Sequence, residues 1–195
     1  MANRNTSGFG LISAGTVGST PATQGQGKYY IDAGATVDLF QGSSVLSSAG
    51  YIITAQAAIT NTCIGVFNGI FYNAATTLKP TWANWYNQPI TPANSEDVTC
   101  FVIDNPTQLF VVSLDTAAAQ AIYGMTMGLT VTAAGSETSG QSSSTLTYAT
   151  RHATNNQWRL VRTAEDPENN QNATFRSVVV AHNLNQYFTG AVTWA

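Results

Sequence analysis

The stretch from residue 62 to residue 72 most constrains the fold, because it is a run of apolar, aromatic and β-branched residues with one interruption. That interruption is Asn68-Gly69, and Asn-Gly suits a type I′ turn, which needs φ > 0 at both central positions. The sequence therefore predicts a β-hairpin whose arms are residues 64–67 and 70–72. The alternative is one continuous strand with a bulge at Asn68-Gly69, since an internal glycine often marks a bulge.

Similar strand-like runs recur along the chain, separated by residues typical of turns such as Asp104-Asn105-Pro106. The expected strands are residues 28–31, 36–40, 44–46, 51–54, 57–60, 98–103, 109–114, 125–132, 145–151, 158–161, 175–181 and 187–194. Residues 117–123 follow Asp115 and precede Gly124, which predicts one helix of about two turns. This pattern predicts an all-β fold, a single antiparallel β-sandwich or barrel of short strands with one short helix.

The first 27 residues differ from the rest in being rich in Gly, Ser, Thr, Asn and Gln. Their one apolar island is Phe9-Gly10-Leu11-Ile12. A segment with so few apolar residues buries too little surface to offset its ordering entropy, so we expect an extended arm that orders on a partner. The alternative is a frayed terminus. The expected organisation is an arm over residues 1–27 and a single β-domain over residues 28–195.

Two further segments lack a strand pattern. Residues 73–95 hold three of the six prolines and the aromatic residues Trp82, Trp85 and Tyr86, which predicts a long irregular connection. These aromatics are expected to pack in the core or at a protein interface, where large aromatic side chains are enriched, and stacking on sugar rings stays open. Residues 135–144 contain Gly, Ser and Thr with almost no apolar content and predict a flexible loop.

Composition narrows the class of function. Only 9% of residues are charged, against about 25% in ordinary soluble domains, so the surface can be buried against a partner with little desolvation of charge. The net charge is −3 and the seven Lys and Arg residues form no run, which argues against a nucleic-acid partner. The chain begins without the apolar region of a signal peptide and has no run of roughly 20 apolar residues. We therefore expect synthesis in the cytoplasm and no membrane partner.

Candidates for chemistry are few. His152 and His182 are the two histidines, and no Gly-x-Ser-x-Gly elbow accompanies them, so we expect no enzyme. Glu165, Asp166 and Glu168 could bind Ca²⁺ with a neighbouring asparagine, but their spacing does not match an EF-hand and also suits a polar turn. No metal or cofactor is expected.

The two cysteines, Cys63 and Cys100, each lie in a strand-like run. This placement favours buried free thiols, and a disulfide between them stays open.

A series of landmarks spans nearly the whole chain. In order, these are Phe9-Gly10-Leu11, Lys28-Tyr29-Tyr30-Ile31, Leu39-Phe40-Gln41-Gly42, residues 64–72, Val102-Ile103-Asp104-Asn105-Pro106, Trp158-Arg159-Leu160-Val161, Pro167-Glu168-Asn169 and Val178-Val179-Val180. The most specific are the Gly-Val-Phe-x-Gly-x-x-Tyr stretch and the Asp-x-Pro turn. This order resembles the head decoration, or cement, proteins of marine and cyanobacterial tailed phages.

The resemblance implies a non-enzymatic structural protein of the virion. It would bind the major capsid protein on the outer surface of the mature head and stabilise the head against the pressure of packaged DNA, as a homotrimer or a dimer. On this reading the arm binds the capsid through Arg4, Phe9, Leu11 and Ile12, and a subunit or capsid interface contains Trp82, Trp85 and Tyr86. The alternative function is that of a carbohydrate-binding β-sandwich module, including one displayed on a virion.

Overall fold

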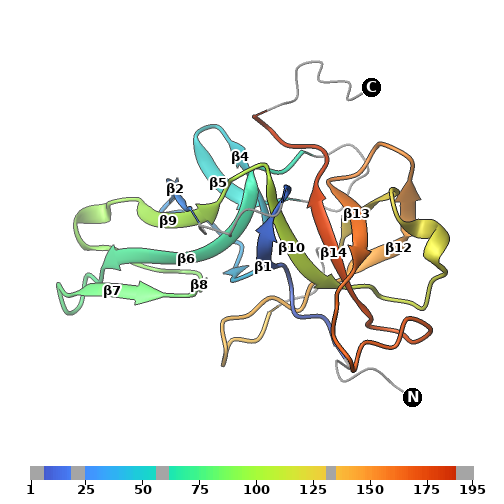
Figure 1. Ribbon diagram of the computed structural model, residues 1–195. Coiled ribbons are helices and arrows are strands. Elements are labelled where there is room, and N and C mark those ends of the chain that lie inside the picture. The colour runs from blue at the N-terminus through green and yellow to red at the C-terminus, as the bar shows by residue number, and fades with distance from the viewer. Residues whose placement is uncertain (1–6, 19–24, 56–61, 131–134, 188–195) are drawn as a thin grey trace.

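The computed structural model describes residues 7–18, 25–55, 62–130 and 135–187. Over these ranges the chain forms two six-stranded sheets and a two-stranded ribbon, and neighbouring strands are antiparallel throughout (Figure 1). The sheets pack as sandwich-like layers, and the helical segments are single 3₁₀ turns. The predicted all-β class is therefore confirmed.

The first sheet contains the edge strand β1 and most of the C-terminal half of the chain. Its strands, in spatial order, are β1 (Ile12–Thr16), β10 (Gln108–Ser113), β14 (Ser177–His182), β13 (Trp158–Thr163), β11 (Thr126–Leu129) and β12 (Leu146–His152). Successive side chains of a strand point to opposite faces, so Phe110 and Val112 of β10 enter the core while Val111 faces outward. Trp158 and Leu160 of β13 belong to the same core cluster.

The second sheet holds most of the N-terminal half. Its strands are β2 (Gly27–Ile31), β9 (Val98–Ile103), β6 (Gly65–Asn73), β4 (Ser44–Ser48) and β5 (Tyr51–Thr54), with β7 (Pro80–Ala83) paired to β6, while β3 (Leu39–Phe40) pairs with β8 (Trp85–Tyr86) as a separate ribbon. The sheet curls, because β2 and β5 at the two ends of this order lie close to each other. Inside the curl is a second core cluster that includes Ile31, Phe67 and Ile70.

The turn at Asp104-Asn105-Pro106 joins the two sheets, because β9 ends in the second sheet and β10 begins in the first. Asn105 Oδ1 accepts a hydrogen bond from Thr107 N at 3.0 Å, the local bond typical of an Asx turn. The turn predicted at this position is confirmed.

The hairpin predicted at Asn68-Gly69 is wrong, and the alternative of a bulged strand is correct. β6 runs without a break from Gly65 to Asn73, and its register against β9 shifts between Phe67 and Gly69. Gly69 instead allows β7 to approach closely, since an added Cβ would lie 2.8 Å from Ala83 O. Pairing with strands on both sides therefore overrides the local turn preference of Asn-Gly.

The helix predicted over residues 117–123 is also wrong. The segment contains only the 3₁₀ turn η2 (Gln120–Ile122). Asp115, the expected N-cap, accepts a hydrogen bond from Tyr148 N at 3.0 Å instead, which ties it to β12. Gly124 does have the positive φ expected after a helical turn, at 86°.

The irregular connection predicted over residues 73–95 contains regular structure. β7 returns along β6, and β8 forms the ribbon with β3, so only the remainder of the segment is irregular.

The predicted loop over residues 135–144 has no strand but is attached to the domain. Gln141 forms an isolated parallel β-bridge with Gln41, and Asn84 Nδ2 donates a hydrogen bond to Ser139 O at 2.6 Å.

The described part of the expected N-terminal arm belongs to the β-domain. Residues 12–16 form β1, which pairs with β10, and Leu11 is 4% exposed within the first core cluster. This segment is therefore ordered by its pairing with β10, which its polar composition does not indicate. Arg4, the strand expected over residues 57–60 and the part of the last expected strand beyond Tyr187 lie outside the described residues.

Candidate binding surfaces

The structure divides the predicted capsid-binding residues between the interior and the surface. Leu11 is buried, so it cannot contact a partner directly in this conformation. Phe9 and Ile12 line a shallow groove of about 620 Å³ on the outer face of the first sheet. We call this surface the β1 groove, and its apolar residues are Phe9, Ile12, Ala14, Val111, Ala164 and Val179.

Strand register explains why these side chains meet. Ile12 pairs with Val111, Val111 pairs with Val179, and Val179 pairs with Arg162, so one row crosses β1, β10, β14 and β13. Ile12 is 47% exposed and Val111 is half-buried. Val179 is buried but belongs to neither core cluster, as expected for a side chain on the outward face. The row places apolar side chains on the outside of the sheet.

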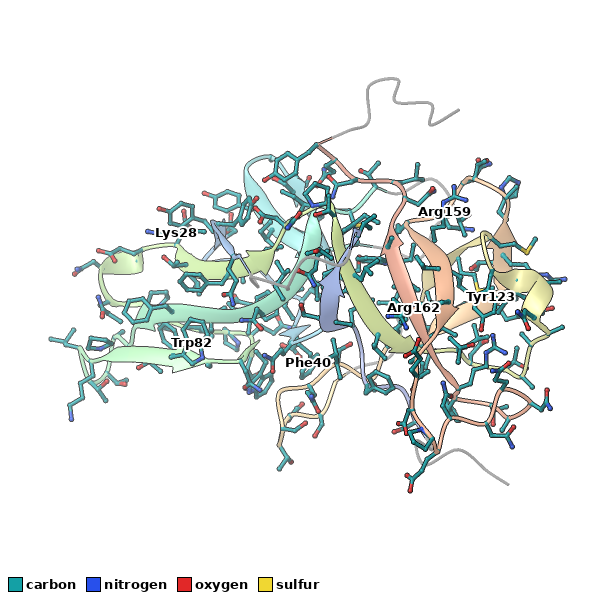
Figure 2. The ribbon with its side chains drawn as sticks, viewed as in Figure 1. Lys28, Phe40, Trp82, Tyr123, Arg159 and Arg162 are labelled. Carbon is teal, nitrogen blue, oxygen red and sulfur yellow. The ribbon has the colours of Figure 1, made fainter. Side chains whose placement is uncertain are left out.

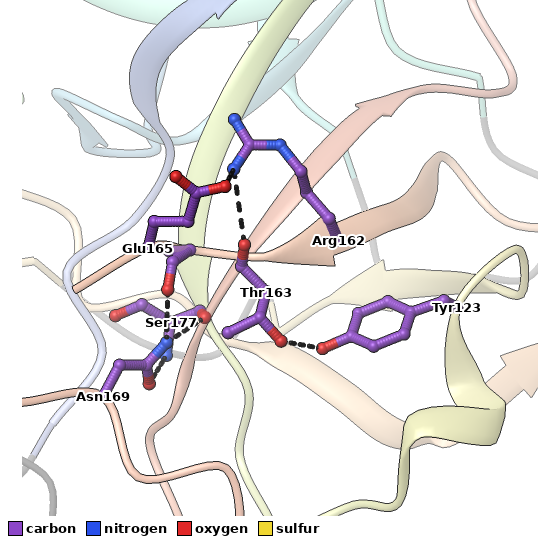
Figure 3. A network of polar contacts seen from close by, with 7 residues as sticks. Tyr123, Arg162, Thr163, Glu165, Asn169 and Ser177 are labelled. Carbon is purple, nitrogen blue, oxygen red and sulfur yellow. Dashed lines mark hydrogen bonds and ion pairs between the residues drawn. The ribbon is translucent and has the colours of Figure 1, made fainter. Parts of the chain in front are cut away.

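The edge of the groove is polar. Arg162 Nη1 lies 3.4 Å from Glu165 Oε1, and both side chains are at least half exposed (Figure 3). Asn169 Nδ2 donates to Ala164 O and to Ser177 O, at 3.0 and 2.7 Å, and Ser177 N donates to Asn169 Oδ1 at 2.9 Å. These bonds hold the polar loop after β13 against β14.

The Ca²⁺ alternative at this loop receives no support from its geometry. Glu165 pairs with Arg162, and Asp166 Oδ1 accepts a hydrogen bond from Glu168 N at 3.0 Å within the turn. Among the described residues, no three or more His, Cys, Asp or Glu side chains are grouped to hold a metal ion. The polar residues here act as turn and rim residues.

A second surface lies on the outward face of the second sheet. Tyr30 pairs with Thr99, Thr99 with Phe71, and Phe71 with Trp82, so a row crosses β2, β9, β6 and β7. The exposed fractions of Tyr30, Phe71 and Trp82 are 45%, 40% and 54%. This row places three exposed rings on one face of the sheet.

Neighbouring residues extend this second surface. The ring of Trp82 contacts that of Phe101, with centroids 5.1 Å apart, and Lys28 Nζ lies 5.4 Å from the ring centre of Tyr30. Trp82 and Lys28 are labelled in Figure 2. We call this surface the aromatic face, made of Lys28, Tyr30, Phe71, Trp82 and Phe101.

The predicted cluster of Trp82, Trp85 and Tyr86 is not a single surface, because the three side chains lie in different environments. Trp85 stacks on Phe40, with ring centroids 5.3 Å apart and planes within 7° of parallel. Tyr86 is completely buried and donates a hydrogen bond to Ala35 O at 3.2 Å. Of the three predicted residues, only Trp82 belongs to the aromatic face, and Tyr86 is a core residue that cannot contact a partner here.

The two histidines lie in different environments. His152 is exposed on β12 and accepts a hydrogen bond from Thr154 N at 3.2 Å. The ring of His182 packs 4.5 Å from that of Trp158, and its Nδ1 lies 3.5 Å from Cys63 Sγ. Burial lowers the pKa of His182 to about 4 and raises the pKa of the Cys63 thiol to about 12. Both groups are therefore neutral near pH 7.

Cys63 and Cys100 are buried free thiols, as predicted, and the open alternative of a disulfide is not formed. Burial also raises the pKa of Cys100 to about 12. A thiol of this pKa is almost entirely protonated near pH 7, and the protonated form is a poor nucleophile. The cysteines thus act as apolar core residues.

No protein-family model, curated protein or solved structure matches this chain. Within the described ranges, no helix has the length and apolar character needed to cross a membrane.

Proposed function

We propose that this protein is a non-enzymatic structural protein of a phage virion, a decoration or cement protein that binds the outer surface of the mature head. By bridging major capsid subunits it would stabilise the head against the pressure of packaged DNA. The order of landmarks from Phe9-Gly10-Leu11 to Val178-Val179-Val180 supports this class. The β1 groove is the docking surface that we assign to it.

The observation that carries the proposal is the exposed side chain of Ile12 on an outward sheet face, next to the half-buried Val111 and in the same row as the buried Val179. Removal of apolar surface from water contributes a favourable free energy of about 25 cal/mol per Å². Contiguous exposed apolar patches commonly mark protein interfaces. β1 ends the strand order of its sheet, so a capsid segment could also pair with its outer edge. The groove thus offers both side-chain and main-chain contacts to a partner.

The charges around the groove suit an interface. Interface centres are poor in charge, and arginine is enriched relative to the rest of the surface. The pair Arg162–Glu165 is solvent-exposed, and pairs of this kind contribute only about 0–1 kcal/mol to stability. Arg162 can therefore exchange Glu165 for a carboxylate of the capsid at little cost.

Oligomerisation would strengthen the attachment. A homotrimer, or a dimer as the alternative, would present several β1 grooves to a symmetric set of capsid subunits. Linked sites bind with an effective concentration that can raise avidity about 10²–10⁴-fold over a single site. Modest affinity at each groove would then be enough for lasting attachment.

Charge placed in the groove tests the assignment. Ile12→Lys and Val111→Lys each put an ammonium group into the apolar row, whereas Leu78→Lys adds the same charge to a residue that is 73% exposed after β6. We expect the two groove variants to lose about tenfold or more in affinity for expanded phage shells that lack the protein, because an unpaired charge is costly to desolvate. The Leu78 variant should bind as the original protein does. Unchanged binding of folded Ile12→Lys and Val111→Lys proteins would refute the groove as the docking surface.

A second candidate function, carbohydrate binding, is favoured by the aromatic face. Exposed rings on neighbouring strands can stack on the C–H faces of sugar rings, since the faces of aromatic rings are electron-rich. Titration of oligosaccharides while tryptophan fluorescence is recorded would test this function. Saturable changes that are lost in Trp82→Ala but kept in Leu78→Ala would support it, and no saturable change would reject it.

A further inference from the structure

A cavity of about 710 Å³ lies at the end of the curled second sheet, between β5 and the connection from β2 to β3. Its floor consists of buried apolar residues, Ile31, Leu39, Ile52, Ala55 and Leu129. The volume falls within the range of about 300–1,000 Å³ typical of small-molecule sites, which are also mostly apolar. This cavity is separate from the β1 groove and from the aromatic face, since it shares no lining residue with either.

The rim of the cavity is acidic. Asp32 is exposed and Asp38 is half-buried, and no lysine or arginine is among the described residues that line the cavity. Asp32 Oδ1 accepts a hydrogen bond from Gly34 N at 2.6 Å, and Asp38 Oδ1 accepts one from Gln88 N at 2.9 Å. Each bond fixes a carboxylate by one oxygen, so the other oxygen can accept from a ligand.

The rim carboxylates contribute to the raised pKa values of two nearby tyrosines. The pKa of Tyr51 is raised first by its hydrogen bond to Asp97 and by the charge of Asp97, then by desolvation, and last by the charge of Asp32. The pKa of Tyr86, behind the cavity, is raised by burial and then by the charges of Asp32 and Asp38. A cation at the rim would be attracted by the two carboxylates, Asp32 and Asp38.

The cavity wall also contains a hydroxyl group without a partner, which can donate or accept a hydrogen bond. Thr54 Oγ1 is buried and has no hydrogen-bond partner in the described structure. A buried polar group without a partner costs about 1–3 kcal/mol, so a ligand atom that bonds to it would gain affinity.

We propose that this cavity binds a small organic cation with an apolar body. The apolar body fills the floor between Ile31 and Leu129, and the ammonium or guanidinium group donates charge-assisted hydrogen bonds to the rim carboxylates, Asp32 or Asp38. The acidic rim should bind a cation more tightly than an anion or a neutral molecule of the same shape. This site does not depend on the capsid proposal.

The probe that tests the site is n-octylammonium, titrated below its micelle-forming concentration. The first control is n-octyl sulfonate, an anion with an alkyl tail of the same length. The second control is ethylammonium, a cation without a long tail. Methyl NMR of the whole protein reports the position of binding through the signals of Ile31, Ile52 and Leu129. We expect saturable 1:1 binding of octylammonium, about tenfold tighter than that of octyl sulfonate, with shifts at these three methyl-bearing residues. Ethylammonium should bind far more weakly, because it leaves the apolar floor uncovered.

The double variant Asp32→Asn, Asp38→Asn separates charge from shape. Both residues lie at the rim, so the variant should fold, which a thermal unfolding curve checks. We expect the preference for octylammonium over octyl sulfonate to disappear in this variant. Absence of saturable binding, equal affinity of the original protein for cation and anion, or an unchanged preference in the double variant would each overturn the proposal. A basic peptide that binds while octylammonium does not would also overturn it, in favour of a protein partner.

Discussion

The Nδ1 atom of His182, at the end of β14, lies 3.5 Å from the Sγ atom of Cys63. This contact connects the first sheet with the segment that leads into β6. The rings of Trp158 and Phe110 pack against the imidazole, and its Nε2 atom is shielded from solvent without a hydrogen-bond partner in the described structure. An imidazolium at this position would be poorly solvated. The contact therefore links the protonation of one histidine to the stability of the fold.

The protein should lose stability as the pH falls from about 6.5 towards 4. The pKa of folded His182 is about 4, below the ordinary value of 6.5, so the unfolded chain takes up a proton first. Since one pKa unit corresponds to about 1.4 kcal/mol, the free energy of unfolding should fall by up to about 3 kcal/mol across this window. Urea unfolding at several pH values measures the change. His182→Phe should lose most of this dependence, and an equal slope in that variant would exclude His182 as its source.

Leu11→Ala should destabilise the fold. Leu11 is 4% exposed in the first core cluster, and loss of a buried leucine side chain typically costs about 2–5 kcal/mol. The neighbouring Ile12→Ala is the matched control, because Ile12 is 47% exposed and its truncation should cost about 1 kcal/mol or less. Chemical unfolding of both variants decides between an integrated strand and a mobile arm. Equal, small effects would favour the mobile arm.

Gly69→Ala should destabilise the second sheet and disturb Trp82. An added Cβ would lie 2.8 Å from Ala83 O and 2.9 Å from Trp82 Cζ2, closer than real Cβ atoms approach. Crowding of this kind typically costs about 1–3 kcal/mol. Unfolding curves and tryptophan fluorescence measure the two effects. Gly34→Ala, whose Cβ would meet only Asp32 Oδ1 at 3.1 Å, should cost less, and the reverse order would contradict the close approach of β7 to β6.

Arg176→Met should be among the more destabilising single substitutions. Arg176 is 1% exposed, Nη1 donates to Ala118 O and Gln171 O at 2.5 and 3.0 Å, and Nη2 donates to Tyr123 Oη at 2.9 Å. Methionine fills much of the volume but removes these three hydrogen bonds, and a hydrogen bond to a charged group typically contributes about 1.5–3 kcal/mol to stability. Thermal unfolding of the variant, beside that of the exposed Arg151→Met, measures the difference. Equal unfolding temperatures would show that the buried guanidinium does not stabilise the fold.

Strands with a strong local pattern could be predicted from the sequence, and elements that depend on pairing partners could not. Residues 98–103 form β9 with the predicted bounds, because their β-branched and aromatic residues favour a strand in any context. Asn68-Gly69 has a strong turn preference, yet β9 pairs with β6 both before and after the bulge, and β7 pairs from Ile70 onward, so β6 stays continuous. The N-terminal strand was missed because its polar residues gain their stability from β10, which is distant in sequence.

The candidate surfaces were predicted in part. Phe9 and Ile12 stand out as an apolar island in a polar segment, and Trp82 stands out in a cluster of large aromatics. Val111 and Val179 were missed because they lie in continuous apolar runs, where the sequence does not show which residues face outward. Tyr30, Phe71 and Phe101 come together only through the register of β2, β9 and β6. Alternation within β2 and β9 was the one local signal of their outward position.

Co-sedimentation of the purified protein with expanded phage shells that lack it, with unexpanded shells as the control, tests the central claim most directly. The proposed function predicts saturable binding to expanded shells alone, with a copy number per shell that matches a symmetry-related set of capsid positions. Absence of binding to either form would contradict the assignment as a head decoration protein.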